Sequence, residues 1–181
     1  MNLKVYCDGS VTGGSWASKK VATVEAHSWC GWYVCRTDNI LIHYKSLDLG
    51  KGPNRSGNFS EYFAIRSALN WLHENHPLAN VQLYSDSRIA IDQIKDVINC
   101  YNETLLIFRN ECRELANTFP SVKFNWIPRT KNTIADTLSR CKQPKFGGRE
   151  LTYAEVQSII NAHCAGTACD QASPTLAVGK K

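Results

Sequence analysis

The sequence predicts an α/β fold, in which a five-stranded mixed β-sheet of three antiparallel strands plus two parallel strands is flanked by α-helices on both faces. The order of segments supports this prediction, because three β-rich runs come first and helical and β-rich segments then alternate. The composition agrees, since 43% of the 181 residues are hydrophobic and 20% are charged, as in globular proteins. No apolar run approaches the roughly 18 residues of a membrane-spanning helix.

Three strands are predicted at the start of the chain. The first ends near Asp8, where an apolar run gives way to the turn signal Asp-Gly-Ser. Residues 30–36 and 40–46 are β-rich and are joined by a polar turn of hairpin length, which predicts an antiparallel meander. Val11–Ser28 is polar and glycine-rich and is expected to form a long loop. Asp8 at the end of an apolar strand could simply cap its own loop, and this alternative gives it no function.

The first helix is predicted from Ser60, a good N-cap, to Asn75. Glu61 lies four residues before the apolar Ile65, so it belongs to the buried side of this helix. An acid in the first turn is also favoured by the helix dipole, and this alternative requires no function for Glu61. It does not explain why Glu61 points inward.

A strand followed by helices comes next. Val81–Ser85 is predicted to be a strand that ends in Asp86, followed by helices over Arg88–Asn99 and Asn102–Phe119. Val122–Ile127 has the alternation of a fifth strand. Asp86 therefore repeats the position of an acid at a strand end, although a plain helix N-cap remains the structural alternative.

The last helix of the predicted core covers Lys131–Arg140. Asn132 and Asp136 are four residues apart, so this helix presents an amide and a carboxylate on one face. Taken alone, the pair is better explained as ordinary solvent-exposed residues.

The chain is predicted to divide into a catalytic domain, residues 1–142, and a C-terminal extension, residues 143–181. The extension is expected to hold a short helix at about 152–163, opened by a capping box, and then a loose tail. The eight cysteines are interpreted as reduced thiols. Because no hydrophobic signal segment opens the sequence, we expect a cytoplasmic protein, and we expect it to be a monomer without membrane contact.

The net charge of +5 is concentrated in one segment. Residues 128–149 contain six cations and one acid, which accounts for the whole excess. A charge run is most often a solvated face, but a basic strip next to clustered acids also fits a polyanionic substrate.

Four acids are the candidate catalytic residues: Asp8, Glu61, Asp86 and Asp136. They are expected to converge, because the carboxyl ends of neighbouring parallel strands meet at one edge of a sheet. Four like charges at such close range cannot all stay ionised without cations. Oxygen ligands without His or Cys select hard ions such as Mg²⁺ or Mn²⁺, and two such ions can promote hydrolysis of a phosphodiester.

Four short motifs in this order resemble the type 1 ribonuclease H family: Asp8-Gly9-Ser10, Asn58-Phe59-Ser60-Glu61, Ser85-Asp86-Ser87 and Asn132-Thr133-Ile134-Ala135-Asp136. The resemblance spans about residues 2–141. It implies the RNase H-like fold and endonucleolytic hydrolysis of the RNA strand of RNA–DNA hybrids, leaving 5′-phosphate and 3′-hydroxyl ends. It also implies that the four acids hold two Mg²⁺ or Mn²⁺ ions and that six residues contact the substrate: Gly9, Ser10, Asn58, Ser87, Arg129 and Asn132.

The sequence departs from the bacterial pattern at two places. Many relatives carry a histidine in the loop before the last helix, whereas the loop here is the shorter Pro128-Arg129-Thr130-Lys131. The predicted helices Arg88–Asn99 and Asn102–Phe119 also leave no room for the basic protrusion with which some relatives grip the hybrid. These short loops resemble the ribonuclease H domains of retroelements and of some archaeal and bacterial single-domain enzymes.

Two other functions are compatible with the same fold. One is a module that binds nucleic acid with weak or no catalysis, although such modules typically lose one or more of the acids and this chain has all four. The other is a nuclease that acts on DNA.

Overall fold

The computed structural model of the chain describes residues 1–12, 26–52 and 55–169, with side chains described as far as residue 165. Its centre is a five-stranded sheet in the order β3-β2-β1-β4-β5. The first three strands form an antiparallel meander, and β4 and β5 run parallel to β1. The predicted mixed sheet is therefore confirmed. The strands are β1 (Asn2–Thr12), β2 (Ala26–Arg36), β3 (Leu41–Gly52), β4 (Asn80–Ser85) and β5 (Ser121–Trp126).

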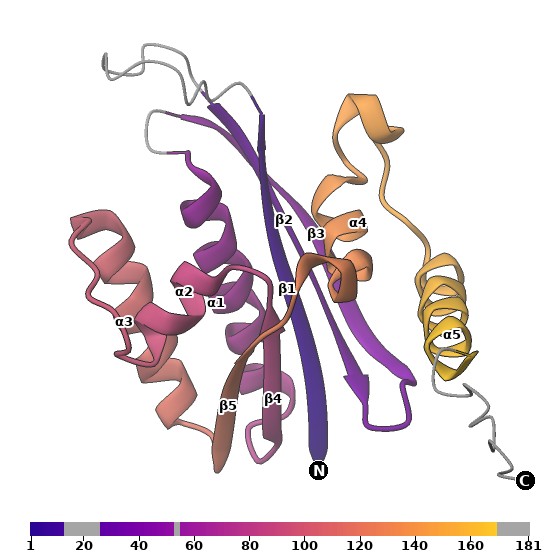
Figure 1. The fold of residues 1–181 in the computed structure, drawn as a ribbon, viewed down its shortest axis with the longest axis horizontal. Helices are drawn as coiled ribbons and strands as arrows, with labels where there is room; N and C mark the ends of the chain where they lie inside the picture. The colour runs from indigo at the N-terminus through magenta and orange to yellow at the C-terminus, as the bar shows by residue number, and fades with distance from the viewer. Residues whose placement is uncertain (13–25, 53–54, 170–181) are drawn as a thin grey trace, which may run out of the picture.

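Helices cover both faces of the sheet, as predicted (Figure 1). One face carries α1 (Gly57–Asn75), α2 (Arg88–Ile94) and α3 (Glu103–Asn117), and the other carries α4 (Thr133–Arg140) and α5 (Tyr153–Cys169). Two short 3-10 helices, η1 (Arg129–Lys131) and η2 (Pro144–Phe146), flank α4. Among the described helices, none has the length and apolar character that a membrane crossing requires.

The alternation of β1 separates two hydrophobic cores. Val5 and Cys7 are buried in the core beneath α1, α2 and α3, whereas Tyr6 packs against a second, smaller core beneath α4 and α5. Asp8 follows the same alternation and lies on the side of α4. The pleat of one strand thus decides which helices the first acid meets.

The prediction that β1 ends at Asp8 is wrong. Antiparallel pairing with β2 continues past Asp8 as far as Thr12 and His27, and only the parallel ladder with β4 stops, at Cys7 and Ser85. Asp8 therefore lies inside a strand that pairs with β2 on one side, while the pairing with β4 on the other side has just ended. Most of the expected loop over residues 11–28 lies outside the described residues, but its two ends belong to β1 and β2.

Several element boundaries also differ from the prediction. The strand β3 runs to Gly52, beyond the predicted end at residue 46, because β2 continues to pair with it. The helix α1 begins at Gly57 rather than Ser60, since Ser56 is the N-cap and its side chain accepts a hydrogen bond from Phe59 N. The helix α2 ends at Ile94 rather than Asn99, shortly before Asp96, which has a φ of 60°.

The helix α5 begins at Tyr153, close to the expected start at about residue 152, but it runs to Cys169 and is longer than the expected helix, which ended at about residue 163. Its first turn has the capping box that the sequence predicts, because Thr152 N donates to Glu155 Oε2 (2.7 Å). It packs on the sheet through the buried Val156 and Ile160, and Gln157 Oε1 accepts from Leu41 N (2.9 Å). The division of the chain at residue 142 stays a prediction, but α5 shares a core with the sheet.

We expect Ile160→Ala to lower the free energy of unfolding by about 2–5 kcal/mol, because it leaves a cavity in the core beneath α5. Chemical denaturation followed by circular dichroism measures the change. The control is Ser158→Ala, an exposed position on the same helix. Equal stability of the two variants would mean that α5 contributes little to the folded domain.

Candidate active site

Two glycines allow helices to approach Asp8 from both faces of the sheet. A Cβ atom on Gly9 would lie 2.3 Å from the backbone nitrogen of Glu61 in α1, and one on Gly31, the β2 partner of Asp8, would lie 2.3 Å from the backbone nitrogen of Ser139 in α4. Such distances exclude any side chain at either position. The backbones of α1 and α4 therefore contact the sheet directly on either side of the first acid.

Three of the four predicted acids lie together at this place. Asp8 comes from β1, Glu61 from α1 and Asp86 from the residue after β4, and each offers a carboxylate oxygen within 4.8 Å of the others. Asp8 is buried, with 1% of its surface exposed, while Glu61 and Asp86 are half-buried. Segments far apart in the sequence thus supply one compact acidic group.

The helix α4 and the residue before it hold two of these carboxylates in place. The Ser139 hydroxyl donates to Asp8 Oδ2 (2.5 Å). The Asn132 amide donates both to Asp86 Oδ1 (2.7 Å) and to the backbone oxygen of Cys7 (2.9 Å). Ser139 had no distinctive signal in the sequence. For Gly31, the sequence did contain a signal, because a glycine inside a strand often marks a close backbone approach.

Asp136 lies beside the compact group but is not part of it. Its Oδ1 atom accepts hydrogen bonds from two guanidinium groups, those of Arg129 (2.6 Å) and Arg140 (2.5 Å). Its backbone oxygen accepts from Ser139, the residue whose hydroxyl also contacts Asp8 (2.9 Å). The structure thus brings three of the acids into direct proximity and leaves the fourth next to them, paired with arginines.

The buried carboxylates resist ionisation. Burial, opposed by the Ser139 hydrogen bond and reinforced by the charges of Asp86 and Asp136, raises the pKa of Asp8 to about 7. Burial and the charges of Asp8 and Asp86 raise the pKa of Glu61 well above its usual range. In addition, Glu61 Oε2 is buried and has no hydrogen-bond partner. A divalent cation fits this group, because it would supply the missing partner and the missing positive charge.

A pH dependence follows from the raised pKa of Asp8. Between about pH 4 and pH 7 the folded chain binds more protons than the unfolded chain, so the free energy of unfolding falls as the pH rises through this interval. We expect Asp8→Asn to remove part of this fall and, in the presence of a chelator, to be more stable than the wild type at about pH 8 by on the order of 2–4 kcal/mol. Thermal unfolding at several pH values measures the difference. A wild-type stability that rises with pH over this interval would contradict the assigned shift.

Comparisons with known proteins identify the family and the fold of the chain. A family model described as "Reverse transcriptase-like" matches residues 22–141, a segment that begins after Asp8 and contains Glu61, Asp86 and Asp136. The chain belongs to the reverse transcriptase-like family. A comparison of the chain with curated proteins gives no match.

Solved structures show the same fold as this reverse transcriptase-like chain. RNase H1 from Halobacterium salinarum NRC-1 is 21% identical, with a TM-score of 0.67 over 80% of this chain and 99% of that chain. LC11-RNase H1, isolated from compost, is 22% identical in its complex with RNA/DNA hybrid, with a TM-score of 0.62 over 75% of this chain and 92% of that one. The protease-reverse transcriptase of prototype foamy virus is 13% identical, with a TM-score of 0.59, and the match covers 83% of this chain but 21% of that protein. The fold predicted from the four motifs is confirmed.

The predicted substrate-contacting residues of this reverse transcriptase-like chain surround the acids but differ in exposure. Asn132 is buried and holds Asp86, and the Ser10 hydroxyl donates to the backbone oxygen of Ser139 (2.6 Å). Asn58 is half-buried in the first turn of α1, and Ser87 is the N-cap of α2. Arg129 is exposed. Several of these groups therefore have structural partners of their own.

The basic strip expected over residues 128–149 is largely paired within the chain. Lys142 lies 3.0 Å from Glu150, and Arg149 lies 2.6 Å from Glu155. Arg129 and Arg140 both bind Asp136. The positive charge that the sequence concentrates here therefore serves in part to neutralise neighbouring acids.

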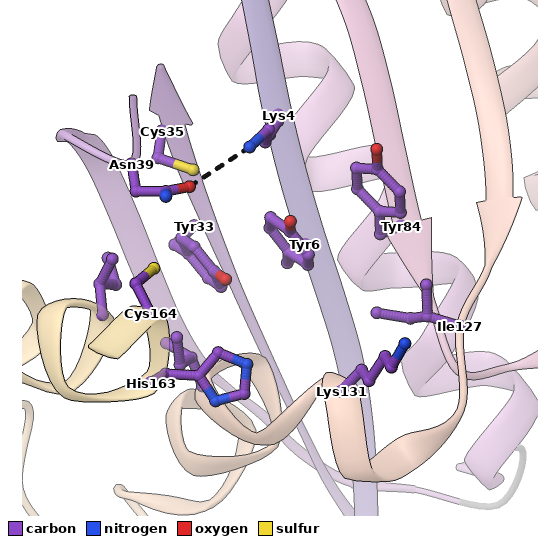
Figure 2. A pocket seen from close by; sticks show the side chains of 12 residues that line it. Lys4, Tyr6, Tyr33, Cys35, Asn39, Tyr84, Ile127, Lys131, His163 and Cys164 are labelled. Atoms are coloured by element: carbon purple, nitrogen blue, oxygen red, sulfur yellow. Dashed lines mark hydrogen bonds between the residues drawn. The ribbon is translucent and has the colours of Figure 1, made fainter. Parts of the chain in front are cut away.

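A cavity of about 280 Å³ lies away from the acids, between the sheet and α5. Tyr33, Tyr6 and Tyr84 stand in a row across β2, β1 and β4 along it, and Lys131 points toward it (Figure 2). None of the four acids lines this cavity. The acidic group is thus a separate site at the end of the parallel ladder.

Proposed function

We propose that the protein is a ribonuclease H, an endonuclease that hydrolyses the RNA strand of RNA–DNA hybrids and leaves 5′-phosphate and 3′-hydroxyl ends. The observation that carries this proposal is the compact group of Asp8, Glu61 and Asp86, with Asp136 beside it. A group of oxygen ligands without His or Cys is suited to Mg²⁺ or Mn²⁺. Two such ions in one site can promote the hydrolysis of a phosphodiester.

In this proposal each acid has a role as a metal ligand. Asp8, Glu61 and Asp86 would hold one ion, and Asp136 would contribute to holding a second. Divalent ions, when bound, supply an activated water and neutralise the charge that develops on the leaving oxygen. The chain itself contributes orientation, because Ser139 fixes the carboxylate of Asp8 and Asn132 fixes that of Asp86.

The preference for RNA rests on the resemblance and on the comparisons. LC11-RNase H1, whose fold this chain shares, is seen in complex with RNA/DNA hybrid, as is the foamy viral protease-reverse transcriptase. We propose that Gly9, Ser10 and Asn58 lie along the RNA strand, where 2′-hydroxyl groups distinguish RNA from DNA. Ser87, Arg129 and Asn132 are proposed to contact the substrate near Asp86 and Asp136.

The test is incubation of the protein with end-labelled RNA–DNA hybrid, duplex DNA and duplex RNA in Mg²⁺ and, separately, in Mn²⁺. We expect cleavage of the RNA strand of the hybrid alone, with products that carry 5′-phosphates and 3′-hydroxyls. Cleavage of duplex DNA would instead indicate a DNA-acting nuclease. Binding of the hybrid without cleavage in either ion would indicate a nucleic-acid-binding module.

A further inference from the structure

Asp136 is bound by two positive groups, while the acids next to it have no such partner among the described residues. Arg129 and Arg140 both place a guanidinium nitrogen on the same oxygen, Oδ1, at 2.6 Å and 2.5 Å. One carboxylate thus faces two positive charges. Arg129 also lies close enough for its charge to act on Asp8 and Asp86. Among these acids, however, Asp136 is the one to which Arg129 donates a hydrogen bond, so its main effect falls on Asp136.

The two arginines are held very differently. Arg140 lies one helical turn after Asp136 on α4, is 30% exposed, and its guanidinium carbon lies 5.6 Å from the centre of the Phe146 ring. Arg129 lies on the short helix η1, outside α4, and its side chain is 64% exposed. Within the part of the chain that the structure describes, Asp136 is the one side chain with which Arg129 forms an ion pair. Asp136 is the ion-pair partner of both arginines among the described residues, but Arg140 is less exposed and also contacts the Phe146 ring, so Arg129 is the less restrained of the two.

We propose that Arg129 is a positioning residue that acts as an internal counter-ion: it occupies the place that a second divalent ion needs beside Asp136 and moves into solvent when that ion binds. This inference rests on the proposed function only in assuming that the acids hold divalent ions. It predicts two unequal ion sites. The first, at Asp8, Glu61 and Asp86, requires no displacement, whereas ion binding at Asp136 competes with the guanidinium of Arg129.

The competition has a measurable size. An exposed ion pair contributes little free energy, so the need to break the pair between Arg129 and Asp136 lowers the affinity for the second ion only modestly. We expect the affinity to be lowered about three- to tenfold once repulsion between Arg129 and the incoming ion is included. Removing the guanidinium should strengthen the second site by that factor and leave the first nearly unchanged. Because Arg129 is exposed on a short turn, its replacement is expected to leave the fold intact.

The experiment is titration of the full chain with Mn²⁺ in the absence of nucleic acid. Binding is measured by calorimetry and by the paramagnetic signal of free Mn²⁺. Arg129→Gln is expected to tighten the weaker of two binding events about three- to tenfold. Lys131→Gln is the matched control, because it removes one positive charge from the same turn at a residue that forms no ion pair among the described side chains. In the Asp136→Asn background the effect of Arg129→Gln should disappear.

Three results would overturn the inference. They are an unchanged weak site in Arg129→Gln, an equal effect of Lys131→Gln, and an effect of Arg129→Gln that persists in Asp136→Asn. Any of these, found together with cleavage of the hybrid, removes the role of Arg129 and leaves the proposed function standing. The absence of all Mn²⁺ binding would remove both.

Discussion

Asp8→Asn is expected to reduce the rate of hybrid cleavage by about a thousandfold or more, the largest effect of any single change considered for this chain. Asp8 lies between Glu61 and Asp86 on one side and α4 on the other, so a neutral amide at this position weakens the binding of both proposed ions. The shape is preserved, because the amide oxygen can still accept the hydrogen bond from Ser139. Single-turnover cleavage of labelled hybrid measures the loss.

The control for this experiment is Asp38→Asn. Asp38 is also an acid, but it lies in the turn between β2 and β3, where its side chain is 46% exposed and pairs with Arg36. Its replacement is expected to leave cleavage unchanged. Asp8→Asn should at the same time unfold at a higher temperature than the wild type in chelator at alkaline pH, which separates a loss of chemistry from a loss of fold. Cleavage by Asp8→Asn at the rate of the wild type would remove the proposed mechanism.

Gly9→Ala is expected to have the second-largest effect, on stability and on activity together. The added Cβ would lie 2.3 Å from the backbone nitrogen of Glu61 and 2.4 Å from the backbone carbon of Ser60, so α1 must move away from β1. Overpacking against backbone costs about 3 kcal/mol or more, which corresponds to a fall in the melting temperature of roughly 6–12 °C for a domain of this size. Since Glu61 moves with α1, cleavage should also fall in the molecules that remain folded.

Gly57→Ala is the matched control, because it adds the same methyl group to the first turn of α1. A Cβ atom there would meet nothing within 4 Å, and alanine is compatible with a helix. We expect equal or slightly higher stability and unchanged cleavage. A Gly9→Ala variant as stable and as active as Gly57→Ala would show that the close contact between β1 and α1 does not position Glu61.

The order of elements and the location of the acids could be predicted from the sequence because both follow from local patterns. Hydrophobic periodicity identified the strands and helices, and the inward position of Glu61 followed from its spacing to Ile65. The residues at which strands and helices begin and end were harder to predict. The strand β1 continues beyond Asp8 because β2 pairs with it, and pairing between distant segments leaves no signature in the few residues around Asp8.

The details of the site depended on tertiary contacts. Two hydrogen bonds that hold Asp8 and Asp86 come from Ser139 and Asn132, more than forty residues away from the acid that each one contacts. The pairing of Asp136 with Arg129 likewise depends on how η1 turns before α4. Arg140 could have been found, because it stands four residues after Asp136 on one helix face.

The most direct test that these acids bind divalent ions is the anomalous scattering of Mn²⁺ in crystals of the protein. We expect a peak at roughly 2 Å from carboxylate oxygens of Asp8, Glu61 and Asp86, with a second peak beside Asp136 at higher Mn²⁺ concentration and Arg129 turned away from it. Mn²⁺ bound elsewhere on the molecule, with none at these carboxylates, would contradict this expectation.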